Sequence, residues 1–144
     1  PIRLTGKKML PAFEHAGGVM LESLDIMSFL DKSNKLKVRE FPQSSEFPAF
    51  ETYLNFLGNP VHSLAMPYWI YTPEFTPEAR QYFQSKKEAK RGPFKELVHK
   101  QATFIETLDQ EFMSLEEKLH PFYESEVFGV KDILLAAHIW GLYV

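Results

Sequence analysis

The sequence predicts a mostly helical α+β protein, in which a β-hairpin and one helix precede an all-helical domain. Three observations lead to this fold class. Short apolar segments flank Gly17-Gly18, and a glycine pair of this kind is typical of a hairpin turn. Beyond residue 44, apolar side chains recur at helical spacing. Proline and glycine divide that second part into separate helices.

The first part of the chain is expected to fold as a hairpin followed by a helix. The strands are expected at residues 9–13 and 19–21. The helix should begin at Glu22 or Ser23 and end near Asp31, with acidic residues in its first turn, where negative charge is favourable. Two strands alone do not make a stable sheet, so this part needs further packing partners.

A polar stretch separates the two parts of the chain. Residues 32–45 lack helical periodicity and are broken by Pro42, which indicates a linker. We therefore expect a first domain over residues 1–33 and a helical domain over residues 44–144, joined by a linker over 34–43.

The helical domain is expected to begin with a helix capped by Ser44 or Ser45. Residues 58–60, Gly-Asn-Pro, should interrupt this helix, and the apolar stretch 61–70 should end or kink at Pro67.

Three more helices follow. Thr76-Pro77 is a strong helix start, and this helix should reach about Lys90 before Gly92-Pro93 stops it. The longest periodic segment predicts one continuous helix from Phe94 to Leu119. A last helix should open at Gly129, with the Asp132 carboxylate reaching back to its first turn.

Composition excludes several classes of function. A net charge of −3 does not favour nucleic acid or anionic membranes. There is no transmembrane run and no signal-peptide pattern, so the cytoplasm is the expected compartment. Without cysteine, the chain has no disulfide, thiolate metal site or cysteine redox chemistry of its own. The five histidines show no ligand spacing, so no metal is expected.

Both ends of the chain predict a fragment of a longer protein. The sequence starts at Pro1 without methionine. It stops directly after the apolar run 133–143, a helix that should be buried on most sides and should carry an end signal.

One combination of residues near the start suits an anionic ligand. Leu10-Pro11 precedes the hairpin, and proline fixes the backbone there. Glu22-Ser23 opens the helix, whose free N–H groups favour a carboxylate, while a glutamate favours an ammonium. The alternative is an ordinary strand-edge proline and an ordinary helix cap.

The chain resembles a known family in five segments. These are residues 6–11, 20–26, 29–32, 75–83 and 86–89, which read GKKMLP, MLESLDI, FLDK, FTPEARQYF and KKEA. They are similar to the GST-like glutaredoxins of the bacterial glutaredoxin 2 type. The resemblance implies that residues 1–33 form the second half of a thioredoxin-like glutathione-binding domain. It also implies that residues 44–144 form an all-α domain like the C-terminal domain of glutathione transferases (GSTs).

The resemblance further implies roles for four residues. Pro11 would be the cis-proline of the thioredoxin fold, and the backbone of Leu10 would pair with the cysteinyl part of glutathione. Glu22 and Ser23 would bind the γ-glutamyl end. The Cys-Pro-x-Cys segment of this family would lie upstream of Pro1, so no catalytic residue is expected in this chain.

The parent protein would then be a monomeric thiol–disulfide oxidoreductase. Its partners would be glutathione, as co-substrate, and disulfides or mixed disulfides. Two rivals stay open: a glutathione transferase, and a non-enzymatic GST-like binding module.

Two further groups of residues have a structural and a functional interpretation. Tyr68, Trp69 and Tyr71 fit aromatic packing better than a substrate groove. The basic residues between Lys86 and Arg91 fit compensation of a helix dipole better than docking of an acidic partner.

Overall fold

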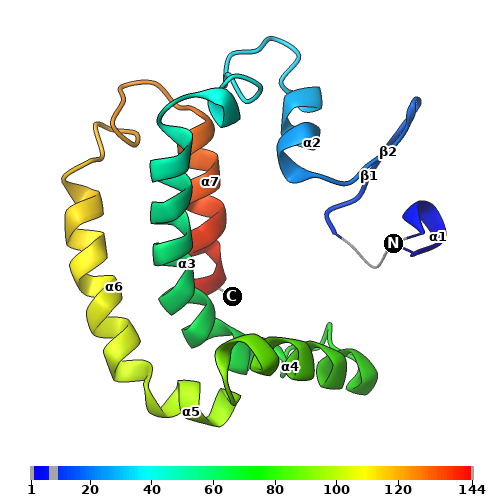
Figure 1. The fold of residues 1–144 in the computed structure, drawn as a ribbon, viewed down its shortest axis with the longest axis vertical. Helices are drawn as coiled ribbons and strands as arrows, with labels where there is room; N and C mark the ends of the chain where they lie inside the picture. The colour runs from blue at the N-terminus through cyan, green and yellow to red at the C-terminus, as the bar shows by residue number, and fades with distance from the viewer. Residues whose placement is uncertain (1, 7–9, 144) are drawn as a thin grey trace.

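The computed structural model describes residues 2–6 and 10–143, which form a small hairpin unit beside a set of helices (Figure 1). In chain order, the elements are α1 (Ile2–Thr5), β1 (Phe13–His15), β2 (Gly18–Met20), α2 (Ser23–Leu30), η1 (Phe41–Gln43), α3 (Phe47–Trp69), α4 (Pro77–Arg91), α5 (Phe94–His99), α6 (Gln101–Glu116), α7 (Val130–Ile139) and η2 (Trp140–Leu142). A short two-stranded sheet followed by helices confirms the predicted fold class.

The hairpin is antiparallel and shorter than predicted. Phe13 pairs with Met20, and His15 pairs with Gly18. The first strand covers Phe13–His15, preceded by residues 10–12 outside the ladder, whereas the prediction was 9–13, and residue 9 lies outside the described residues. Pro11 explains part of this difference, because a residue without an N–H cannot continue a ladder. At the turn, the Gly17 N–H donates to His15 Nδ1 over 3.1 Å.

Helix α2 has the start and end that the sequence predicts. Glu22 is its N-cap residue and Asp31 its C-cap residue. The Phe29 ring lies 5.7 Å from that of Phe13 and 4.5 Å from that of His15, measured between centroids. These contacts fix the helix on the hairpin.

The stretch read as a linker contributes to the core. Val38 is 1% exposed and Phe41 is buried, and both belong to the larger core cluster. Leu24 and Met27 of α2 pack against the same cluster. The hairpin unit is therefore attached to the helices through apolar contacts as well as through the chain.

Helix α3 differs from the prediction at both ends and in its middle. Its N-cap is Glu46, because the Ser44 hydroxyl instead donates to the Phe41 carbonyl over 2.8 Å. It continues through Gly58, Pro60 and Pro67 to Trp69, so the predicted interruption is wrong.

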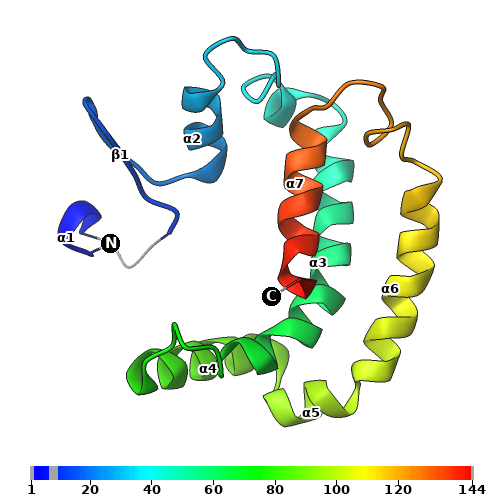
Figure 2. The ribbon, with the colours of Figure 1, turned by 180° about the vertical axis from the view of Figure 1, so that it is seen from behind.

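The core position of α3 explains this continuity. A helix-interior proline costs about 3 kcal/mol. Leu57 and Val61, which flank Pro60, are fully buried, and each such side chain contributes about 1.5–3 kcal/mol. Figure 2 shows α3 between α6 and α7, and packing on both neighbours favours a continuous helix over a broken one.

The segment predicted as a single helix from Phe94 to Leu119 is two helices, α5 and α6, joined at Lys100. The two helices serve different clusters: Phe94 and Leu97 pack with Met66 and Ile70, whereas Leu108 and Leu115 belong to the larger core. A straight helix could not reach both clusters, and the second helix ends at Glu116.

The predicted start and end of α4 and the predicted start of α7 are confirmed. At the start of α4, Thr76 Oγ1 accepts from the Ala79 N–H over 3.2 Å. Gly92 ends this helix with a φ of +85°, a value that suits glycine. At the start of α7, the Gly129 N–H donates to Asp132 Oδ2 over 2.8 Å, as predicted.

Candidate functional site

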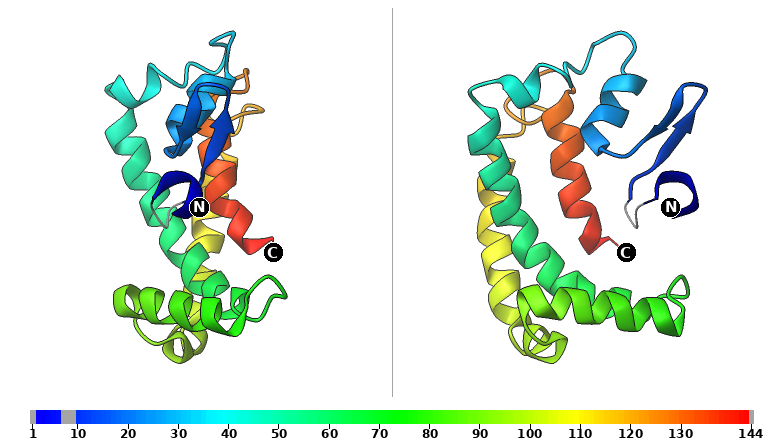
Figure 3. Two further views of the ribbon diagram at one scale, coloured as in Figure 1. Left: turned by 90° about the vertical axis from the view of Figure 1, so that its right-hand side faces the viewer. Right: turned by 45° about the vertical axis from the view of Figure 1, so that its right-hand side comes forward.

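The segment before β1 and the start of α2 lie at the same end of the hairpin, as the two views of Figure 3 show. The pairing of Phe13 with Met20 explains why. This pair ends the ladder, so Leu10 and Pro11 precede the sheet at the same end at which the chain leaves it toward Glu22 and Ser23. The hairpin thus brings the four sequence-predicted site residues to one place.

The Leu10–Pro11 peptide bond is cis, as the resemblance implies. Leu10 is 73% exposed, and Pro11 is exposed as well. Neither residue belongs to a strand, so the backbone here is not used in the described sheet. A ligand can therefore reach the main chain of Leu10.

The start of α2 supplies polar groups of both signs. Glu22 has an extended backbone, and its carbonyl accepts from the Ile26 N–H over 2.9 Å. Its carboxylate makes no capping bond to the helix, so it is free to meet a cation. The first N–H groups of a helix lack internal acceptors and carry a partial positive charge. Ser23, at the first position, is exposed beside them.

This arrangement can hold a zwitterionic end of a small molecule. The amides and the Ser23 hydroxyl suit a carboxylate, and the Glu22 carboxylate suits an ammonium. Asp25, in the same turn, weakens the attraction for anions and adds to that for cations. The Phe29 ring, near the other end of α2, packs on Phe13 and holds the helix on the hairpin.

The aromatic residues Tyr68, Trp69 and Tyr71 make their described contacts with other helices. Tyr68 donates a hydrogen bond to Gln101 over 3.4 Å, and the Arg80 guanidinium lies 5.5 Å from the Tyr71 ring centroid. Trp69 packs against the second core cluster and against Gly141. The structural interpretation of Trp69 agrees with these contacts.

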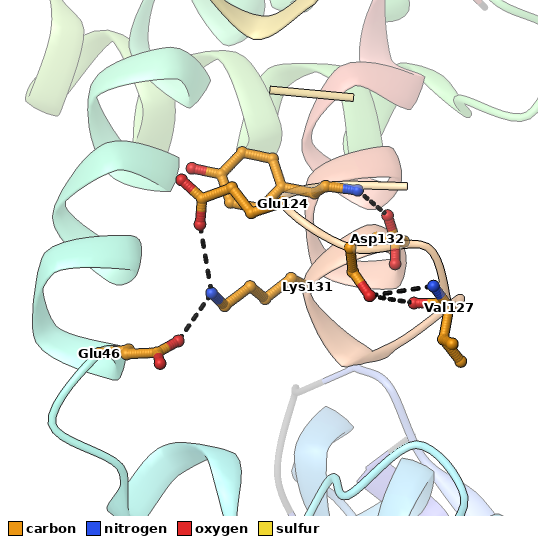
Figure 4. A network of polar contacts seen from close by, with 7 residues as sticks. Glu46, Glu124, Val127, Lys131 and Asp132 are labelled. Carbon is orange, nitrogen blue, oxygen red and sulfur yellow. Dashed lines mark hydrogen bonds and ion pairs between the residues drawn. The ribbon is translucent and has the colours of Figure 1, made fainter. Parts of the chain in front are cut away.

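A charged network around Lys131, which sequence analysis did not predict, is shown in Figure 4. The Lys131 ammonium lies 2.7 Å from Glu46 and 3.4 Å from Glu124. It also lies over the rings of Phe41, Phe50 and Tyr123, at 5.7 to 5.9 Å from their centroids. This network joins the start of α3, the start of α7 and the loop before α7.

Charge explains the pKa directions in this network. Burial lowers the pKa of Lys131, but hydrogen bonds and charges of Glu46 and Glu124 outweigh it and raise the pKa overall. The hydrogen bond and charge of Lys131 lower the pKa of Glu46. The network pairs a lysine with two carboxylates, and we assign it a structural role rather than a catalytic one.

The described part of the chain offers neither a cluster of metal ligands nor a membrane-spanning helix. Residues 2–6 and 10–143 contain no group of three or more histidine, aspartate or glutamate side chains placed to hold a metal ion. None of the helices in these ranges combines the length and apolar character that crossing a membrane requires.

Comparison with known proteins gives consistent matches. The family model for the C-terminal domain of glutaredoxin 2 matches residues 49–144. Glutaredoxin 2 of Escherichia coli K12 is 30% identical over 121 residues, which cover 81% of this chain and 55% of that protein. The protein of the same name from E. coli O157:H7 matches to the same extent. The chain thus spans about half the length of the curated relatives it matches.

A solved structure is also similar. It is the crystal structure of glutaredoxin 2 from Salmonella typhimurium in complex with glutathione, with a TM-score of 0.79 and 27% sequence identity. The match covers 99% of this chain and 66% of that one. The likeness therefore includes the hairpin unit as well as the helices.

Proposed function

The chain belongs to the glutaredoxin 2 family, and on that premise we propose that it is part of a glutathione-dependent thiol–disulfide oxidoreductase. In such an enzyme a cysteine thiolate attacks a disulfide, and glutathione then resolves the mixed disulfide. The 144 residues include no cysteine, so the thiolate comes from outside them. The role we propose for this chain is to hold glutathione beside that thiolate.

The proposed glutathione site consists of Leu10, Pro11, Glu22 and Ser23. The observation that supports it most is the hairpin, whose end pair, Phe13 with Met20, lies between Leu10-Pro11 on one side of the chain and Glu22-Ser23 on the other. The backbone of Leu10 would pair with the cysteinyl part of the tripeptide. The γ-glutamyl end carries both an ammonium and a carboxylate, which suit the Glu22 carboxylate and the helix N-terminus with Ser23.

The division of the chain is part of this proposal. Residues 1–33 would be the glutathione-binding part, residues 44–144 the helical domain, and 34–43 the connection. Burial of Val38 in the larger core supports a connection that holds the two parts at a fixed angle. We further propose a monomer that works in the cytoplasm, where the glutathione pool is kept reduced.

The experiment that tests the site is a glutathione titration of the chain carrying Glu22→Ala together with Ser23→Ala. Each lost charge-assisted hydrogen bond is worth about 1.5–3 kcal/mol, so we expect affinity to fall at least tenfold. Calorimetry or amide chemical shifts give the dissociation constant. A matched control is Glu14→Ala with Ser33→Ala, since both residues are exposed and lie outside the proposed site.

The two pairs of variants separate the rival functions. Equal affinity in both pairs would contradict the site, and no affinity in any form of the chain would favour a non-enzymatic binding module. A transferase would bind glutathione in the same way as a glutaredoxin. The family match therefore supports the oxidoreductase over the transferase.

A further inference from the structure

A surface pocket of ≈ 480 Å³ lies where the end of α4 meets α3, α5 and the start of α6. Figure 2 shows these elements converging at the lower end of the molecule. The polar lining residues are Asn59, Ser63, Lys90, Arg91 and Lys100. Three of them are cations, and neither aspartate nor glutamate is among the residues that line the pocket. This volume falls in the usual range for small-molecule sites.

Arg91 is held in the pocket by neutral acceptors alone. Its Nη1 donates to the Asn59 carbonyl at 3.2 Å, to Asn59 Oδ1 at 2.7 Å and to Ser63 Oγ at 3.3 Å. Among residues 2–6 and 10–143, the ion pairs all involve Lys131, so no carboxylate neutralises Arg91. Nor does a described residue accept a hydrogen bond from its Nε or Nη2. That edge of the guanidinium is the one that binds an oxyanion with two parallel hydrogen bonds.

Ser63 makes this a built site rather than a set of loose surface cations. It is 3% exposed and is the polar residue buried in the described core. Buried hydroxyls are rarely left without a partner, and this one meets Arg91. Because Ser63 lies in the middle of α3, it fixes the guanidinium against a rigid element.

Compensation of the α4 dipole does not account for all of this charge. The C-terminal end of a helix carries about half a negative charge. Lys90, Arg91 and Lys100 bring a formal charge of +3 to one pocket. Lys100 lies beyond α4, between α5 and α6, and therefore does not belong to the last turn of that helix.

The positive charge around Arg91 contributes to the lowered pKa of a neighbouring lysine, whereas burial is what lowers the pKa of Arg91 itself. Burial, followed by the charges of Arg91, Lys86 and Lys90, lowers the pKa of Lys87. A bound anion would offset this repulsion.

We propose that this pocket binds a phosphate ester, with the phosphate on Arg91 and Lys100. A guanidinium fork with two lysine ammonium groups in the same pocket suits a dianion better than a single carboxylate. Leu97 and Phe104 line the pocket next to the cations and offer an apolar wall for the organic group. The pocket shares no residue with the proposed glutathione site, so an experiment can contradict one proposal without affecting the other.

The test is a titration of the chain with phenyl phosphate, without glutathione and at constant ionic strength. Amide chemical shifts should move at residues 90–104, and binding should saturate. Inorganic phosphate should bind more weakly, because it has no group to place on Phe104. Loss of the Arg91 fork in Arg91→Gln should weaken binding about tenfold or more.

Two further variants test phosphate-ester binding even if the Arg91→Gln variant does not fold. Lys100→Gln removes an exposed lining cation and should weaken binding about threefold. Lys95→Gln removes an equally exposed charge that does not line the pocket, and it should leave the affinity unchanged. Binding that does not saturate, or equal weakening by Lys95→Gln and Lys100→Gln, would overturn the proposal in favour of general electrostatic attraction.

Discussion

Lys131 is the residue through which three separate segments of the chain are joined. Its side chain is 22% exposed and lies between Glu46, at the start of α3, and Glu124, in the loop before α7. Three aromatic rings surround its ammonium. A partly buried cation of this kind loses water on folding, so its carboxylate partners are needed to stabilise it.

We expect Lys131→Gln to lower stability more at neutral pH than in acid. The pKa of Glu46 is lowered in the folded chain, so its contribution is present above the ordinary glutamate pKa and is lost as pH falls through the lowered value. The pKa of Lys131 is raised, so its contribution is full below the ordinary lysine pKa and is lost above the raised one. The decrease in the free energy of unfolding caused by Lys131→Gln should therefore be largest near neutral pH.

Urea unfolding of the native chain and the variant, at neutral pH and again near pH 3, measures this difference. The control is Lys32→Gln, because Lys32 is exposed and no ion pair involves it among residues 2–6 and 10–143. If the Lys131→Gln variant were destabilised equally at both pH values, the ion pairs would not be its stabilising contacts.

Sequence analysis predicted the contact of Asp132 at the start of α7 but not the ion pairs of its neighbour Lys131. Asp132 was predictable because its partner, the Gly129 N–H, is three residues away, and local spacing decides the contact. The same carboxylate also accepts from the Tyr123 N–H over 2.8 Å, a contact across the loop. Lys131 meets Glu46 from a distant part of the chain, and only the packing of α7 on α3 brings them together.

At the scale of elements, α4 has little buried surface, although the Phe83 ring in its middle packs against the second core cluster. The helix has no buried residue, whereas α3 has ten. Its start depends on the Thr76 side chain, and its end on Gly92 and on the Phe94 N–H, which donates to Glu88 over 2.8 Å. A helix with so little burial depends on its caps more than a core helix does.

We expect Thr76→Ala to loosen α4 selectively. Loss of an N-cap side chain costs about 1 kcal/mol, which is a large part of the local stability of an exposed helix. Amide hydrogen exchange should rise in the first turns of α4 and stay unchanged in α3. Thr76→Ser retains the hydroxyl and serves as the control. Uniform exchange changes in both helices would mean that α4 unfolds only together with the core.

The elements predicted best are those with local signals. Thr76-Pro77 and Gly92 act through their own backbone conformation, and the structure uses both. Pro60 is also a strong local signal, but its helix lies in the middle of the core, and burial outweighs the lost hydrogen bond. The break at Lys100 has no local signal, because it follows from the separate clusters that α5 and α6 serve.

At the scale of the whole molecule, the hairpin unit depends on the helices for its position. Two short strands do not form a stable sheet by themselves. Leu24 and Met27 of α2 pack against a core that α3, α6 and α7 complete. The four residues of the proposed glutathione site were predicted through the family resemblance, since the residues alone also fit an ordinary strand-edge proline and helix cap. Their meeting at one end of the hairpin depends on a register that the sequence did not fix.

The last prediction concerns the activity of the chain by itself. Thiol–disulfide exchange needs a thiolate that attacks a disulfide sulfur, and these 144 residues have none. We therefore expect the chain to bind glutathione without reducing a mixed disulfide faster than glutathione does in its absence. An assay coupled to glutathione reductase, read as NADPH consumption, measures the rate with and without the chain.

A rate that rises in proportion to the concentration of the chain would contradict this division of roles. Glutathione bound beside Glu22 and Ser23 would then have to react without an enzyme thiolate, through a lowered pKa of its own thiol. Measuring the same rates with the Glu22→Ala, Ser23→Ala variant separates these outcomes. If that variant abolished the excess rate, the site would activate glutathione itself, as a transferase does. If the excess rate persisted, its source would lie outside the proposed site.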